Sequence, residues 1–331
     1  MKKIIQLAVG CSISAIMMYL AFKDLDVERL KESFSAMKLW PVIPFIALFG
    51  LHFYARSLRW RLLLPSLEGN RIPIRKLFDS IMLGNLASFI LPLRLGEFIR
   101  PLLLSRWSEY SFASSFISVV IERFFDLSGV LIAFAIVVPL LPELPSWATV
   151  GAYSLGIVAL CLLLFLIFGC LFPKFIRAAV ALVVAPLPKV LGRFINNFAS
   201  DLLTGAAVIK TPSRLLGIIG LTGAVWLTTF LQFYVLLFIF PLEQQSALLG
   251  VTLGVFVALA VALPSAPGFV GVFQMGCVAA MTLFAYPTAA AQVYSIVVHL
   301  ITFILIIAIG FWLLSVHDLN LFELKRAAER D

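Results

Sequence analysis

Charged residues and cysteine pairs are scarce in this chain. Only 13% of its 331 residues are charged and 62% are hydrophobic, whereas soluble domains carry about 25% charged residues. The four cysteines, Cys11, Cys161, Cys170 and Cys277, form no CxxC and lie in apolar segments, which argues against disulfides or a metal site. The sequence also has no HExxH, GxSxG or Gly-rich phosphate loop. These absences predict a polytopic membrane protein with no cofactor and no bound metal.

The net charge of +8 comes from basic residues that gather between the apolar segments. The positive-inside rule assigns such loops to the cytoplasm. It puts the N terminus, the 56–76 and 173–214 regions and the C-terminal tail on that side. We therefore predict a multi-pass protein of the inner (cytoplasmic) membrane with both termini cytoplasmic. The excess charge indicates contact with anionic lipid headgroups rather than with nucleic acid.

Apolar segments of about 20 residues predict membrane-spanning helices. Six segments are long enough to cross: residues 3–22, 40–64, 112–141, 147–172, 215–240 and 288–316. The first is long for a signal peptide, and no clear small-residue cleavage site follows it, so we interpret it as a retained helix. Residues 23–38 are polar and predict a short amphipathic link. The expected fold is all-α with six full spans.

Two further apolar pairs are each broken by proline and glycine. Residues 77–91 and 95–107 flank Leu91-Pro92-Leu93-Arg94-Leu95-Gly96, and residues 247–263 and 269–284 flank Leu263-Pro264-Ser265-Ala266-Pro267-Gly268. Both breaks contain Leu-Pro-x-x-x-Gly. If each pair enters and returns on the same side, and the two enter from opposite faces, they are the re-entrant hairpins of an inverted repeat. The alternative to the hairpins is eight or more full helices. The alternative to the repeat is a chance similarity, because Leu, Pro and Gly are common in membrane helices.

The whole chain, 1–331, is predicted to be one integral membrane domain. Its repeat halves would be 1–172 and 213–331, joined by 173–212, a basic segment that contains an amphipathic helix on the inner membrane surface.

Charged residues lie inside the apolar segments around the first break. A charge at the bilayer centre costs roughly 2.5–3.5 kcal/mol on insertion scales, so such residues face a protein interior or a wet cavity and mark functional sites. Glu97 and Arg100 are spaced i, i+3 and can pair. Glu122 and Asp126 are spaced i, i+4, which puts both carboxylates on one helix face, while Arg123 points elsewhere, toward Glu97.

Two interpretations of these charges compete. They form either an ion-pair cluster that fixes helix packing or a binding site for a headgroup or phosphate, with Arg94 meeting the anion beside free helix-start N–H groups. Paired carboxylates also do acid–base chemistry, but no nucleophile or metal motif accompanies them. Arg56, Arg59 and Arg61, around Trp60, are interpreted as interfacial anchors rather than ligands, although Arg59 would join the site if it faced inward.

These residues resemble a known family. Asn85, Leu91-Pro92-x-Arg94-x-Gly96-Glu97-x-x-Arg100 and Glu122-Arg123-x-x-Asp126 are similar, in this order, to motifs of the lysylphosphatidylglycerol synthase transmembrane (flippase-like) family. Leu263-Pro264-x-x-Pro267-Gly268-x-x-Gly271 and Arg56-x-x-Arg59-Trp60 add to the resemblance, which covers nearly the whole chain. Gln274 departs from it, because many members have an acid there.

The resemblance implies a stand-alone membrane module without the soluble aminoacyl-transferase domain, and a transporter or flippase of an anionic phospholipid or a polyprenyl-phosphate-linked lipid. A lipid-modifying enzyme is an expected partner. The alternatives are a membrane-embedded transferase or accessory subunit acting on lipid-linked sugars, and a non-catalytic scaffold. The substrate-binding residues expected are Asn85, Arg59, Arg94, Glu97, Arg100, Glu122, Arg123 and Asp126, and the residues expected to shape the breaks or act as hinges are Pro92, Gly96, Pro264, Pro267, Gly268 and Gly271.

Overall fold

The computed structural model describes residues 2–23, 27–65, 72–91, 94–141, 211–240 and 245–320, together with scattered residues between 150 and 196. All regular structure in these ranges is helical, which confirms the predicted all-α class. The elements are α1 (Lys2–Phe22), α2 (Val27–Ser35), α3 (Val42–Leu63), α4 (Ile74–Ile90), α5 (Gly96–Trp107), α6 (Phe112–Val137), η2 (Val138–Leu140), α10 (Pro212–Leu237), α11 (Ala247–Ala262), η4 (Pro267–Phe269), α12 (Val272–Thr282) and α13 (Thr288–Val316). The predicted span at 147–172, the basic segment at 173–212 and Pro92 lie wholly or mostly outside the described residues.

Three of the described helices are long and apolar enough to cross a membrane: Phe112–Leu140, Pro212–Leu237 and Thr288–Val316. At a rise of about 1.5 Å per residue, their 26 to 29 residues reach beyond a hydrocarbon core about 30 Å thick. The total of six full spans stays a prediction.

The two broken pairs consist of shorter helices. The 12 residues of α5 and the 11 residues of α12 rise only about 18 and 16 Å, so neither crosses a bilayer alone. At the second break Gly268 and Gly271 have φ values of 72° and 88°, a left-handed backbone that glycine adopts without steric cost. A helix too short to cross the membrane therefore follows each break. The re-entrant course of the two pairs and the inverted repeat stay predictions.

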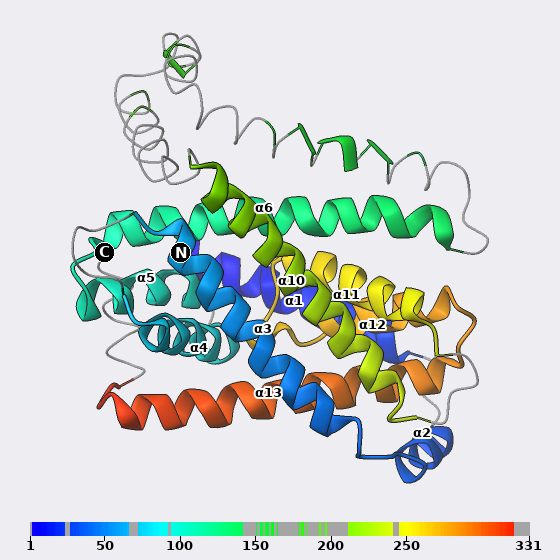
Figure 1. The fold of residues 1–331 in the computed structure, drawn as a ribbon. Helices are drawn as coiled ribbons and strands as arrows, with labels where there is room; N and C mark the ends of the chain where they lie inside the picture. Colours follow the sequence, from blue (N-terminus) through cyan, green and yellow to red (C-terminus); the bar gives the residue numbers. More distant parts are fainter. Residues whose placement is uncertain are drawn as a thin grey trace.

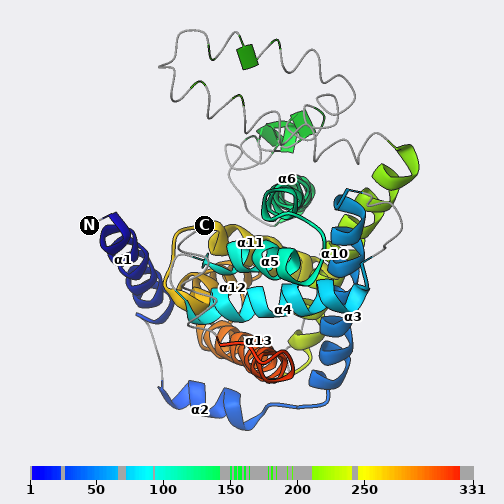
Figure 2. The ribbon, with the colours of Figure 1, turned by 90° about the vertical axis from the view of Figure 1, so that its left-hand side faces the viewer.

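The broken pairs lie in the centre of the helix assembly. Figure 2 shows α4, α5, α11 and α12 between α6 on one side and α13 on the other, with α3 and α10 along one flank. Figure 1 shows α3 and α10 running obliquely across the other helices. The central position of α5 brings its charged residues against the middle of α6.

Close approach of α4 and α5 depends on two glycines. A Cβ added to Gly96 would overlap the carbonyl oxygen of Gly84 on α4. Gly96 thus allows the two helices of the first broken pair to pack backbone to backbone, as small residues do at membrane helix interfaces. Gly96, predicted from the sequence to shape the first break, therefore has a packing role between α4 and α5.

Candidate functional site

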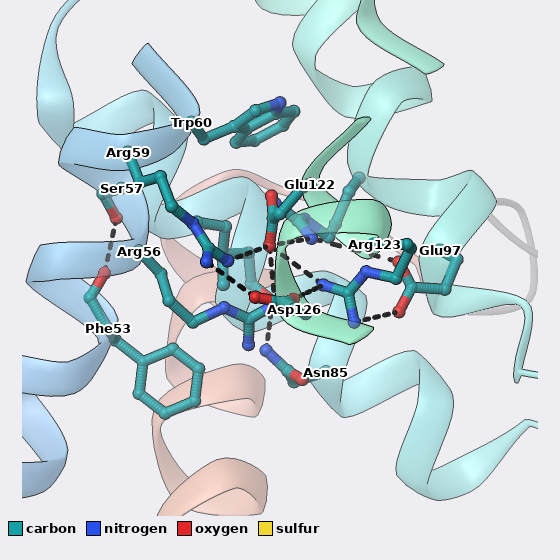
Figure 3. Close-up of polar contacts among 12 residues, drawn as sticks. Phe53, Arg56, Ser57, Arg59, Trp60, Asn85, Glu97, Glu122, Arg123 and Asp126 are labelled. Carbon is teal, nitrogen blue, oxygen red and sulfur yellow. Dashed lines mark hydrogen bonds and ion pairs between the residues drawn. The ribbon is translucent and has the colours of Figure 1, made fainter. Parts of the chain in front are cut away.

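Glu122, in the middle of α6, is the centre of a buried ion cluster (Figure 3). Its side chain is fully buried and contacts arginines from three helices. Arg56 and Arg59 of α3 each place an Nη2 3.2 Å from its Oε1, Arg123 of α6 lies 2.9 Å from the same oxygen, and Arg100 of α5 lies 2.9 Å from Oε2. Each carboxylate oxygen offers about two acceptor positions, so the donors of four arginines crowd Oε1, whereas Oε2 accepts from Arg100 alone among the described residues.

Asp126 lies one turn beyond Glu122 and extends the cluster. Its Oδ1 is 2.6 Å from Arg59 Nη1, and its Oδ2 is 3.2 Å from Arg123 Nη2. Both α6 carboxylates contact Arg59, which confirms that they share one helix face. Arg59 Nη1 also donates to the hydroxyl of Thr222 on α10 at 3.2 Å, so α10 borders the cluster.

Glu97 forms the accessible edge of the cluster. Its carboxylate lies 3.6 Å from Arg123 Nη1 and 3.9 Å from Arg100 Nη1, so both predicted pairings are present but long. The side chains of Glu97 and Arg123 are 37% and 44% exposed, whereas Arg100 is buried. The cluster is therefore closed on the α3 side and open where Glu97 meets Arg123.

The charges within this group do not cancel. Four guanidiniums face three carboxylates among the described residues, which leaves a formal charge of +1. The Nε donors of Arg59 and Arg100 are buried and have no hydrogen-bond partner in the described part of the chain. A buried donor without a hydrogen bond costs roughly 1–3 kcal/mol. Binding of a ligand whose acceptor reached these two Nε atoms would remove that cost. We refer to the seven residues Arg56, Arg59, Glu97, Arg100, Glu122, Arg123 and Asp126 as the arginine cluster.

A buried tryptophan holds two sides of the arginine cluster together. The Arg100 guanidinium lies 4.5 Å from the centre of the Trp60 ring, a cation–π contact. The Trp60 indole N–H donates to Ser118 Oγ at 2.8 Å. Trp60 is buried, and Arg56 and Arg59 pair with the buried Glu122. The interpretation of these two arginines as interfacial anchors is therefore wrong, and the alternative that Arg59 faces inward is confirmed. The spacing i, i+3 of these two arginines was the signal that both face one partner.

Arg94 makes its hydrogen bonds to the second break. It donates to the backbone carbonyls of Val261 and Leu263, the latter at 2.7 Å, and its guanidinium lies 5.2 Å from the Phe269 ring centre. The direct contacts of Arg94 among the described residues are therefore with the second break, although its charge also interacts with Glu97 and Arg123 at the edge of the arginine cluster. Arg94 connects the first break to the second, where it caps carbonyls at the end of α11 that have no helical partner.

The second break is tied to α13 through neutral polar groups. Gln274 Oε1 accepts from the Gly271 N–H at 2.8 Å, and its amide nitrogen lies 2.8 Å from Nδ1 of His299. The other ring nitrogen of His299 is 2.8 Å from the Gly268 carbonyl oxygen. The contact between Gln274 and His299 is thus a hydrogen bond between α12 and α13. Asn85, on α4, donates to its own helix at the Ile81 carbonyl (2.8 Å).

Comparison with protein families gives one match, and it covers most of the chain. The family described as "Lysylphosphatidylglycerol synthase TM region" matches residues 5–310, a range that contains the arginine cluster and both breaks. No curated protein and no solved structure matches. The family is a membrane-embedded, multi-pass region with a membrane lipid-related function. The chain therefore belongs to the lysylphosphatidylglycerol synthase TM region family.

Proposed function

We propose that the protein moves an anionic lipid across the membrane and binds the lipid phosphate at the arginine cluster. The observation that carries this proposal is the formal charge of +1 inside a set of membrane-embedded helices. A charge buried in the membrane is costly unless it is paired. The single negative charge of a phosphodiester headgroup would neutralise the cluster.

The Glu97–Arg123 edge is the proposed entry for the phosphate. Its contact of 3.6 Å is longer than the 2.9 Å contact between Arg123 and Glu122, and both side chains are partly exposed. A phosphate oxygen would form shorter, charge-assisted hydrogen bonds with Arg123 than Glu97 does. The unpartnered Nε groups of Arg59 and Arg100 supply further donors deeper in the cluster.

The two breaks are proposed to be the moving parts. Arg94 joins them through carbonyls that cap α11, so relative movement of the two broken pairs must break these bonds. The left-handed Gly268 and Gly271, with Pro264 and Pro267, give the second break a backbone suited to a hinge. We place the protein in the inner membrane with cytoplasmic termini, because the basic loops would then lie on the cytoplasmic side.

Transport of a fluorescent lipid tests this function. The purified protein would be reconstituted in phosphatidylcholine vesicles with a trace of NBD-labelled phosphatidylglycerol, and dithionite would bleach the label that reaches the outer leaflet. Arg123→Gln removes the surplus charge and one exposed phosphate donor. Losing a hydrogen bond to a charged group costs about 1.5–3 kcal/mol, so we expect transport to slow at least tenfold.

The control is the same substitution at Arg106, which is exposed at the end of α5. Arg106→Gln should transport like the unaltered protein. Thermal unfolding of both variants in detergent checks that they are folded. Equal transport by Arg123→Gln and Arg106→Gln, or no transport by the unaltered protein above empty vesicles, would overturn the proposal.

A further inference from the structure

An apolar groove lies between α6 and α10. Its volume is about 390 Å³, within the roughly 300–1,000 Å³ of ligand pockets. One wall is formed by residues between Phe125 and Ile136 of α6, and the other by residues between Ile219 and Phe230 of α10. On both helices the lining residues recur at spacings of three and four, which is one continuous helix face. Ile136 and Leu227 are mostly exposed, so the described residues leave the groove open along its side.

The groove has the length of one membrane leaflet. Each wall covers eleven residue steps, which is about 16 Å of α-helix. The hydrocarbon core is about 30 Å thick, so the groove spans roughly half of it. An acyl chain of a glycerophospholipid has this reach, whereas a polyprenyl chain is far longer than one leaflet.

The groove begins where the arginine cluster ends. Phe125, at one end of the α6 wall, is adjacent in sequence to Asp126. Thr222 lines the groove and also accepts a hydrogen bond from Arg59 at 3.2 Å. The polar and apolar sites are therefore continuous, with a charged end and an apolar body. A phospholipid has the same division.

One polar atom in the groove has no partner. The indole nitrogen of Trp226 is buried without a hydrogen bond among the described residues. It lies against Gly129 of α6, where the absence of a side chain leaves room for the ring. Trp226 is one turn from Thr222, so its N–H is near the charged end. A glycerophospholipid carries an ester carbonyl between phosphate and chain that would accept from this N–H, and a polyprenyl phosphate has none.

We propose that the α6–α10 groove holds one acyl chain of an anionic glycerophospholipid whose phosphate is bound by the arginine cluster. This proposal rests on the proposed function and names its substrate class. The groove lets the chain stay in contact with the membrane interior while the headgroup is among the arginines. Its open side allows the chain to enter and leave laterally.

Two glycines on α10 provide a matched test. Gly223 lines the groove and Gly220 does not, both are exposed, and a Cβ added to either meets nothing within 4 Å. Gly223→Phe adds a bulky side chain at the groove wall, starting from a Cβ that meets no neighbour, and Gly220→Phe adds the same side chain outside the groove. Delipidated protein would be titrated with dioleoylphosphatidylglycerol and observed by native mass spectrometry. We expect one lipid bound with similar Kd by the unaltered protein and Gly220→Phe, and at least tenfold weaker binding by Gly223→Phe.

Several outcomes would overturn the acyl-chain assignment. The first is equal lipid binding by the two glycine variants. The second is a change of oligomeric state in Gly223→Phe without a change in lipid binding. The third is that the unaltered protein binds a polyprenyl phosphate more tightly than phosphatidylglycerol, and that Gly223→Phe weakens this binding. Failure of the transport function is separate. Unaltered protein that binds phosphatidylglycerol in the groove but does not move NBD-labelled lipid would refute transport alone. Transport with equal binding by both glycine variants would refute the groove alone.

Discussion

Replacing Glu122 by glutamine removes the common counter-ion of four arginines. The amide keeps the size of the side chain, but the formal charge of the arginine cluster rises from +1 to +2. All four guanidiniums lie within 3.2 Å of this carboxylate, and Glu122 is fully buried. Breaking a buried ion pair by removing one partner costs about 3–5 kcal/mol. The midpoint shifts by roughly 2–4 °C per kcal/mol in chains of 150–250 residues and by less in longer ones, so in this chain of 331 residues we expect the unfolding midpoint to fall by roughly 5–10 °C.

The assay is thermal unfolding of purified protein in detergent, followed by tryptophan fluorescence, with Glu97→Gln as the matched control. Glu97 makes only long contacts of 3.6 and 3.9 Å and is 37% exposed. Exposed pairs contribute at most about 1 kcal/mol, so Glu97→Gln should lower the midpoint by no more than about 2 °C. Equal shifts for the two variants would refute the assignment of Glu122 as the centre of the cluster.

A second substitution separates charge from packing. Glu122→Gln combined with Arg123→Gln returns the cluster to +1, because one acid and one base are removed together. Groups in one network couple by about 0.5–3 kcal/mol, so the double variant should be more stable than the sum of the single effects predicts. Strict additivity would mean that lost packing, not uncompensated charge, destabilises Glu122→Gln.

Three other predictions concern the breaks. Gly96→Ala should destabilise the fold by about 1–3 kcal/mol through overpacking, because the added Cβ overlaps the Gly84 carbonyl oxygen. Size-exclusion profiles after heating should show this loss of stability, and Gly220→Ala, the control, should be as stable as the unaltered protein. Arg94→Gln should speed hydrogen exchange of the backbone at 264–271, because both bonds to the end of α11 are lost; unchanged exchange would show that Arg94 does not hold the second break. Gln274→Leu should lower stability by about 1–2 kcal/mol, because the first turn of α12 loses its cap, whereas Gln274→Glu keeps the acceptor and should cost less in the same unfolding assay.

Helix positions were the part of the fold that sequence patterns located well. The predicted segment 288–316 coincides with α13 (Thr288–Val316), and the segment at 112–141 covers α6 and η2. Hydropathy, proline and glycine are local signals, so they mark helix ends without knowledge of neighbouring helices. The i, i+4 spacing of Glu122 and Asp126 is equally local, which is why their common face could be derived.

Long-range pairing was not available from these patterns. Arg94 donates to the carbonyls of Val261 and Leu263, more than 160 residues away in sequence, and no sequence pattern indicated this contact. Arg56 was interpreted as an interfacial anchor, and nothing in its neighbourhood identifies Glu122 as its partner. The free-energy cost of burying a charge requires that each of these arginines has a partner. Many carboxylates or carbonyls in the chain could be that partner, so the sequence does not identify it.

Composition and periodicity alone therefore established an all-α membrane protein with charged residues and helix breaks inside it, because each of these properties depends on residues within one helix. The tertiary structure decided that arginines of α3, α5 and α6 all contact the Glu122 carboxylate. It also decided that Arg94 joins the two breaks and that an apolar groove adjoins the arginine cluster. These features depend on how helices far apart in sequence are rotated and packed, and that is set by contacts summed over the whole assembly.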